Sequence, residues 1–194
     1  NLLAGVAAVV KPASLTSYLT EAVVREIIAS KILPEGALQL ICGSAGDILD
    51  HVTSQDVITF TGSAITGLKL KSNPNVLREN VPFNLEADSL NCIVLGDDVT
   101  AGMPEWDIFI KEVRKEMTSK CGQKCTAIRR IFVPENKMED VWKAISQALD
   151  QTTIGNPQNE KVRMGSLAGQ SQKEEVLEHV TKLLASSHVI YSSV

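Results

Sequence analysis

The chain has 194 residues, of which 44% are hydrophobic, and its formal net charge is −4. This length predicts one large domain or parts of two, with enough apolar residues for a sizeable core. The acidic charge and an aromatic content of only 4% argue against a nucleic-acid partner, because surfaces that bind nucleic acid are basic. No apolar run reaches the roughly 18 residues of a membrane span, so we expect no membrane partner.

The four cysteines, Cys42, Cys92, Cys121 and Cys125, are too sparse for a disulfide framework. They favour a reducing compartment and therefore a cytoplasmic location. No second Cys or His pair accompanies Cys121 and Cys125 at zinc-binding spacing, so we predict no metal site. Residues 1–5 contain neither Met nor a basic segment, which predicts an internal start rather than a signal peptide.

The first half of the chain alternates between strand-like and helix-like patterns. Short apolar runs at residues 6–10, 38–42 and 57–60 predict buried strands, and helical spacing of apolar residues follows each run. This alternation predicts a parallel α/β sheet. Residues 73–75 read Asn-Pro-Asn and predict a loop, and residues 82–87 predict a short extended segment.

The second half continues with buried strands predicted at residues 92–95 and 128–133 and a final strand at 189–191. A helix is predicted from Pro104, because apolar residues recur at helical spacing after it. These residues are Trp106, Phe109, Ile110, Val113 and Met117. Two further helices are predicted over residues 136–151 and from about Ser171. Asn136 and Glu139 stand in capping-box order at the start of the first of these two.

Cys125 is the candidate nucleophile, because it lies near a predicted bend between a helix that stops at Gly122 and a strand. A thiol becomes reactive where positive charge or backbone N–H groups favour the thiolate. Lys120 and Lys124 are close in sequence and are candidates for that charge. The alternative is a small buried cysteine with a packing role.

Three other positions have the chemistry of a cofactor or catalytic site. Residues 62–67, Gly-Ser-Ala-Ile-Thr-Gly, follow a predicted strand and open a helix, a place suited to phosphate, although a purely structural turn is the alternative. Lys11 follows the first strand, where open α/β sheets bind ligands, unless it is simply solvated. Glu86 has apolar neighbours that would raise its pKa and suit a general base, unless it is exposed on an edge strand.

Together these motifs resemble the aldehyde dehydrogenase superfamily over the whole chain. The matching runs are residues 8–12, 60–63 with Gly67, 85–86 and 122–125. The resemblance implies an excised α/β piece, in which a portion of a parallel Rossmann-like sheet precedes part of an α/β catalytic domain. Residues 1–87 would be part of the NAD(P)-binding domain and residues 88–194 part of the catalytic domain.

The resemblance also implies roles for individual residues. Cys125 would be the nucleophile, forming a thiohemiacetal and then a thioester with an aldehyde substrate, and Glu86 would be the general base. Lys11 would hold the adenosine ribose region. Ser14 stands where NAD-preferring members often have Glu, so the expected cofactor is NADP, with NAD as the alternative. Gly62, Ser63 and Gly67 would form the pyrophosphate turn, and the parent protein would be a homo-oligomer.

A departure from the family pattern points to a narrower group. Glu86 is followed by Ala-Asp-Ser-Leu-Asn, where the family usually has Gly-Gly. With residues 42–47 and 122–130, this variant resembles dehydrogenases that oxidise CoA-linked semialdehydes in bacterial phenylacetate degradation, or alternatively in benzoyl-CoA epoxidation. Two other classes are a non-catalytic nucleotide-binding module and a thiol-redox module. The latter would use Cys121 and Cys125, whose spacing differs from the C-x-x-C of that chemistry.

Overall fold

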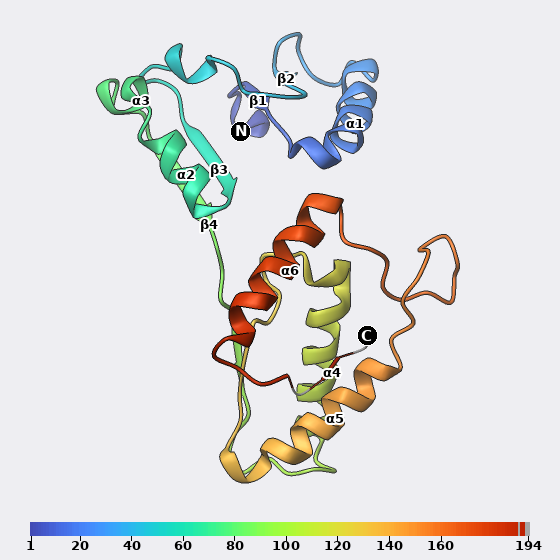
Figure 1. Cartoon of the computed structure of the whole chain (residues 1–194). Coiled ribbons are helices and arrows are strands. Elements are labelled where there is room, and N and C mark those ends of the chain that lie inside the picture. The colour runs from blue at the N-terminus through green and yellow to red at the C-terminus, as the bar shows by residue number, and fades with distance from the viewer. Residues whose placement is uncertain (190, 193–194) are drawn as a thin grey trace. The chain divides into compact units, whose positions relative to one another are not determined.

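The computed structural model describes residues 1–189 and 191–192, and it divides into two compact units, Asn1–Asp88 and Ser89–Val194. Figure 1 shows that each unit combines short strands with helices. The mixed α/β character predicted from the sequence is therefore present in both.

The first unit contains two parallel strand pairs. Strand β1 pairs with β2, and β3 pairs with β4. Among the described residues these pairs form two-stranded sheets rather than the single sheet that we predicted. One side of each pair is therefore open, and Val9, predicted to be buried, is 51% exposed. The elements of this unit are η1 Leu2–Ala4, β1 Ala8–Val10, η2 Ser14–Thr16, α1 Ser17–Ala29, β2 Leu38–Leu40, η3 Ile48–Asp50, β3 Ile58–Gly62, α2 Ala64–Lys71, α3 Pro74–Arg78 and β4 Phe83–Ala87.

Helix α2 packs closely against β3 and β4 because Gly67 has no side chain. A Cβ atom at Gly67 would lie 2.2 Å from Leu85 Cδ1 and 3.1 Å from Phe60 Cδ1. Carbon atoms that are not bonded do not approach to 2.2 Å, so a larger residue would require the Leu85 side chain or α2 to shift. Gly67 thus allows α2 to lie close to β3 and β4.

The predicted loop at residues 73–75 is wrong, because these residues start helix α3. The Asn73 side chain accepts hydrogen bonds from the N–H groups of Asn75 (2.8 Å) and Val76 (3.3 Å), and Pro74 is the first helical residue. Asn at the N-cap followed by Pro is a strong helix start. The same two residues also occur in turns, and the short helix that follows gave too little periodicity to distinguish the two.

The second unit has one parallel strand pair, β5 with β6, and three long helices. Helix α4 packs against α5, as Figure 1 shows. The elements are β5 Cys92–Val94, α4 Pro104–Thr118, η4 Ser119–Gly122, β6 Arg130–Phe132, η5 Glu135–Lys137, α5 Met138–Asp150 and α6 Gln170–Leu184. The strand predicted at 189–191 includes Ile190, which lies outside the described residues, and neither Val189 nor Tyr191 is in a strand.

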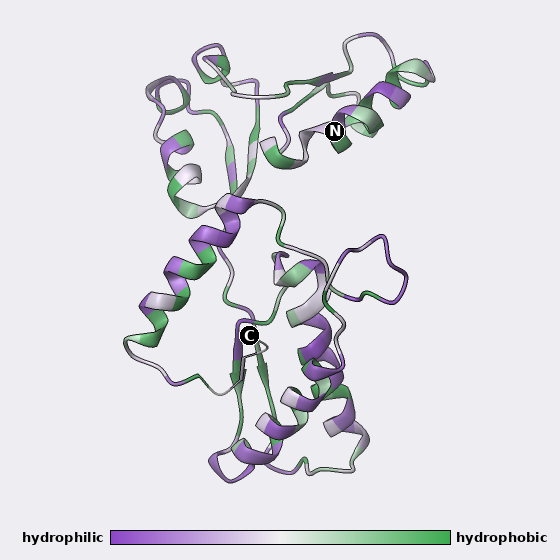
Figure 2. Cartoon of the chain, turned by 45° about the vertical axis from the view of Figure 1, so that its right-hand side comes forward, coloured by the Kyte–Doolittle hydropathy of each residue, from purple (hydrophilic) through white to green (hydrophobic). Residues whose placement is uncertain are grey.

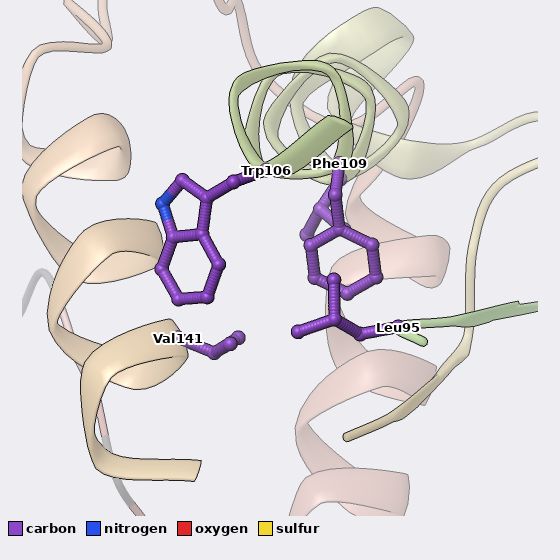
Figure 3. Close-up of a cluster of buried hydrophobic side chains, with 5 residues drawn as sticks. Leu95, Trp106, Phe109 and Val141 are labelled. Atoms are coloured by element: carbon purple, nitrogen blue, oxygen red, sulfur yellow. The ribbon is translucent and has the colours of Figure 1, made fainter. Parts of the chain in front are cut away.

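The core of the second unit lies between α4, α5 and the end of β5. In Figure 3, Trp106 and Phe109 from α4 point toward Val141 of α5 and toward Leu95. Val113, one turn further along α4, is completely buried. The apolar stripe predicted for this helix is confirmed at these three positions, whereas Met117 at its end is 39% exposed.

Several surfaces that we predicted to be buried are open. Cys92 and Val94 of β5 are exposed and only Ile93 between them is partly buried, and all three residues of β6 are exposed. In α6, hydrophobic and hydrophilic residues alternate (Figure 2), and no residue of this helix is buried. Among the described residues, none of the helices is long and apolar enough to cross a membrane.

Lys137 ties the start of α5 to the loop after β5. It is buried, and its Nζ donates to the carbonyl oxygens of Asp97, Val99 (2.5 Å) and Gly96 (3.5 Å). An ammonium group has three N–H donors, so all three find acceptors here. The predicted capping box is wrong, because Asn136 lies inside the 3-10 turn η5 and Lys137 is the N-cap of α5.

We expect Lys137→Met to lower the free energy of unfolding by roughly 2–3 kcal/mol, because three carbonyl oxygens would lose the charged donor that they share. Urea titration of the whole protein measures the change. The matched control is Lys143→Met, which removes an exposed lysine from the same helix, one paired with Glu139 at 2.6 Å. Surface ion pairs contribute little, so equal destabilisation by the two variants would contradict the role of Lys137.

Candidate active site

Cys125 lies on a tightly held loop between α4 and β6. The loop begins with three consecutive residues in the left-handed region, Lys120 (φ 52°), Cys121 (φ 56°) and Gly122 (φ 69°). Such backbone is uncommon for residues other than glycine and persists where surrounding contacts hold it. Helix α4 itself ends at Thr118, and the predicted stop at Gly122 is the end of the η4 turn.

Contacts with residues 165–168 hold the first part of this loop. The Cys121 thiol donates to the carbonyl oxygens of Gly165 (3.0 Å) and Ser166 (3.2 Å), and Gln123 Oε1 accepts from the N–H of Ala168 (3.0 Å). Burial raises the pKa of the Cys121 thiol. A thiol that stays protonated and donates to carbonyls has a structural role, which favours Cys125 as the reactive cysteine.

Two of the cations near Cys125 in sequence have other partners. Lys124 Nζ forms an ion pair with Glu116 Oε1 at 2.9 Å, with side chains only 24% and 15% exposed. Arg129 Nη2 donates to the carbonyl oxygen of Gly122 at 2.8 Å. These cations therefore stabilise the loop. Cys125 is a free, exposed cysteine, so its side chain is accessible.

The carbonyl oxygen of Cys125 accepts hydrogen bonds from two side chains that the sequence analysis did not assign to the site. The donors are Ser89 Oγ and Asn91 Nδ2, the latter at 2.7 Å. Both belong to the segment that replaces the usual Gly-Gly after Glu86. That replacement was the only signal in the sequence that pointed to Ser89 and Asn91. It did not indicate that their partner is the carbonyl oxygen of Cys125.

The parallel pairing of β3 and β4 brings several predicted site residues to one edge of the sheet. Thr61 is opposite Glu86, and Gly62 is opposite Ala87, so the turn at Gly62 and Ser63 adjoins the end of β4. Glu86 is exposed rather than enclosed by apolar side chains. The reason is the alternation of a strand: Leu85 faces α2, and Glu86 faces the opposite side.

The start of α2 already holds an anionic oxygen. Ser63 is the N-cap, and its Oγ accepts from Thr66 N at 3.3 Å. The N–H of Ala64 donates to Asp88 Oδ2 at 3.3 Å. The first N–H groups of a helix suit phosphate oxygens, and the Asp88 carboxylate shows that this end accepts negative charge. A dinucleotide phosphate that used the Ala64 N–H would have to replace Asp88, a residue that sequence reasoning missed.

Lys11 and Ser14 lie just after the carboxyl end of β1. Lys11 is exposed, and its Nζ donates to the carbonyl oxygen of Pro12 at 3.0 Å. Ser14 begins η2, and its carbonyl oxygen accepts from Ser17 Oγ at 3.0 Å. Both residues are exposed. No group of three or more His, Cys, Asp or Glu residues in the described part of the chain could hold a metal ion.

Comparison with known proteins identifies the family. A sequence profile described as "Aldehyde dehydrogenase family" matches residues 1–192. The chain belongs to the aldehyde dehydrogenase family. The resemblance drawn from the motifs around Cys125, Glu86 and Gly62 is therefore confirmed at the level of the family.

One curated relative of this aldehyde dehydrogenase chain has a specific name. The 3,4-dehydroadipyl-CoA semialdehyde dehydrogenase of Aromatoleum evansii is 44% identical over 190 residues, which are 98% of this chain and 37% of that protein. The chain thus spans about 37% of the length of the curated relatives that it matches.

Solved structures show the same fold at lower identity. An NADP dependent enzyme from E. coli superposes with a TM-score of 0.80 at 23% identity, covering 93% of this chain and 37% of the other. A mutant of aldehyde dehydrogenase C from Pseudomonas syringae, complexed with NAD+ and octanal, gives a TM-score of 0.81 at 21% identity, covering 95% and 37%. The predicted aldehyde dehydrogenase fold is confirmed.

Proposed function

We propose that this aldehyde dehydrogenase oxidises a CoA-linked semialdehyde to the carboxylic acid, with NADP as the hydride acceptor. The observation that carries the proposal is the 44% identity to a dehydrogenase named for such a substrate. An accessible Cys125 on a held loop agrees with it, because covalent aldehyde oxidation needs a nucleophile of fixed orientation.

In the proposed reaction, the Cys125 thiolate attacks the aldehyde carbon and forms a thiohemiacetal. Backbone N–H groups near Cys125 would hold the oxyanion, as preorganised donors do in other acyl-transfer sites. The bound dinucleotide supplies the acceptor for the hydride that leaves this carbon. Cys125 then holds the acyl group as a thioester, which water must cleave to release the acid.

Glu86 is proposed as the base that takes a proton from this water. Its place at the carboxyl end of β4, opposite Thr61 and next to the Gly62 turn, supports this role, because ligands of α/β sheets bind at such ends. Ser89, three residues further along the chain, donates its hydroxyl hydrogen to the Cys125 carbonyl oxygen. Glu86 is thus closely connected in sequence to the segment that holds the Cys125 loop.

The cofactor is proposed to bind to the first unit, as part of an NAD(P)-binding domain, with the second unit as part of the catalytic domain. Gly62, Ser63 and the start of α2 would hold the pyrophosphate, and Lys11 and Ser14 the adenosine ribose region. Gly67 would act indirectly, because its lack of a side chain allows α2 to pack closely against Leu85 and Phe60.

Assays of the whole protein test the substrate. We expect NADPH formation with 3,4-dehydroadipyl-CoA semialdehyde and a kcat/KM lower by about tenfold or more for the same aldehyde without CoA, because the CoA contacts contribute binding energy. The corresponding substrate in phenylacetate degradation is 3-oxo-5,6-dehydrosuberyl-CoA semialdehyde. A comparison of kcat/KM for the two CoA-linked semialdehydes therefore distinguishes the benzoyl-CoA pathway from the phenylacetate pathway. Equal oxidation of CoA-linked and free aldehydes would contradict the substrate class.

We expect Ser14→Glu to lower kcat/KM for NADP by about tenfold relative to NAD, because a carboxylate near a 2′-phosphate repels it. Steady-state kinetics with each cofactor measure the ratio. Ser54→Glu is the matched control, since Ser54 is an exposed serine in the same unit. If the ratio of kcat/KM for NADP to that for NAD were unchanged in Ser14→Glu, Ser14 would not be part of the ribose site.

A further inference from the structure

Two side chains form a clamp on the backbone of Cys125. The hydroxyl of Ser89 and the Nδ2 of Asn91 donate to the same carbonyl oxygen, that of Cys125. The two donors also contact each other, since Asn91 Nδ2 lies 3.3 Å from Ser89 Oγ. A carbonyl oxygen has two lone pairs, so this arrangement uses its full accepting capacity.

The clamp is attached to the strand pair of the second unit. The carbonyl oxygen of Asn91 accepts from the N–H groups of Arg129 (2.9 Å) and Arg130 (3.2 Å). The residue after Asn91 is Cys92, which begins β5 and pairs with Arg130 of β6. The side chain that holds Cys125 therefore extends from a backbone that the sheet itself holds.

The two hydrogen bonds to the Cys125 carbonyl oxygen have two consequences for the sulfur of the same residue. First, rotation of the peptide between Cys125 and Thr126 would break both hydrogen bonds, and the next anchor, Ala127, is completely buried, so the direction of the Cys125 side chain is restricted. Second, the partial negative charge of the oxygen stays directed at two donors. An unheld carbonyl could turn toward the thiolate and disfavour it.

We propose that Ser89 and Asn91 are positioning residues, which hold the Cys125 peptide so that its carbonyl oxygen faces the clamp and its sulfur stays available for attack. The proposal rests on the proposed function, in which Cys125 is the nucleophile. It also gives a reason for the polar segment that replaces Gly-Gly after Glu86, because glycine has no side chain with which to form a clamp.

Kinetics and thiol labelling of the whole protein test the clamp with Ser89→Ala and Asn91→Ala. Both side chains are exposed, so the variants should fold, which circular dichroism verifies. We expect kcat to fall by about 10- to 100-fold, the scale of a small misplacement of a reacting group, with KM changed less than about twofold. The pH profile of Cys125 alkylation by iodoacetamide, followed by peptide mapping, should move to higher pH.

Conservative and control variants separate positioning from general disturbance. Ser89→Thr keeps a hydroxyl and should recover most of the activity and the original pH profile. Ser171→Ala removes an exposed serine in α6 and should change neither. Unchanged kcat and pH profiles in both clamp variants, together with an inactive Cys125→Ala, would overturn the clamp and leave the proposed function standing. An active Cys125→Ala would instead overturn the proposed function.

Discussion

Replacing Cys125 with Ala is expected to lower kcat/KM by about 10⁴-fold or more, the scale on which enzymes lose activity when their nucleophile is removed. No hydroxyl or thiol would remain at this position to form the thiohemiacetal. The loop itself should persist, because its anchors involve the Cys125 carbonyl and the neighbouring residues Cys121 and Gln123 rather than the Cys125 sulfur. Steady-state formation of NADPH measures the loss.

Two other cysteines provide matched controls. Cys42 and Cys92 are also free and exposed, so Cys42→Ala and Cys92→Ala remove accessible thiols that are not part of the Cys125 loop. Both variants should keep nearly full activity. If Cys125→Ala stayed active, or if a control variant lost activity equally, the assignment of Cys125 as nucleophile would be wrong.

Replacing Glu86 with Gln is expected to separate the two halves of the reaction. Attack by Cys125 and hydride transfer do not consume water, whereas cleavage of the thioester does, and an amide is a poor acceptor for the proton of that water. We therefore expect a first turnover that produces NADPH at a rate close to the original. Steady-state kcat should then fall by about 10²- to 10⁴-fold, the usual contribution of a general base.

Rapid mixing, followed by NADPH absorbance, measures this first turnover as a burst of NADPH. Glu35→Gln is the control variant. Glu35 is an exposed glutamate in the same unit, so this variant removes equal charge without touching β4. If the Glu86→Gln protein turned over at the original steady-state rate, Glu86 would not be the general base. Loss of the burst as well would assign Glu86 to an earlier step.

The fold could be predicted where the local sequence pattern and the tertiary packing agree, as they do in α4. Its stripe of Trp106, Phe109 and Val113 faces the core as the helical spacing indicates. The same reasoning failed where burial depends on what covers a surface. The apolar run around Val94 does not indicate which residues of the β5–β6 pair are left uncovered. In the structure, Val94 is 66% exposed.

Cys125 and Ser63 could be put forward as candidates from the sequence, because each would act through its own chemistry. The candidate site was not predictable where a residue acts through a distant contact. Asp88 reaches the start of α2 across 24 positions, and Ser89 reaches the Cys125 carbonyl across 36. Gly67 was predicted to bind the cofactor from its motif, whereas the contact that the structure shows for it is close packing against Leu85.

Peptide mass spectrometry of the acylated enzyme tests the account most directly. The Glu86→Gln variant would be mixed with NADP and 3,4-dehydroadipyl-CoA semialdehyde, quenched in acid and digested. We expect the added mass of the acyl group on the peptide that contains Cys125, sensitive to hydroxylamine as a thioester is. The acyl group on Cys42, Cys92 or Cys121 instead, or no adduct in a protein that still forms NADPH, would contradict catalysis by Cys125.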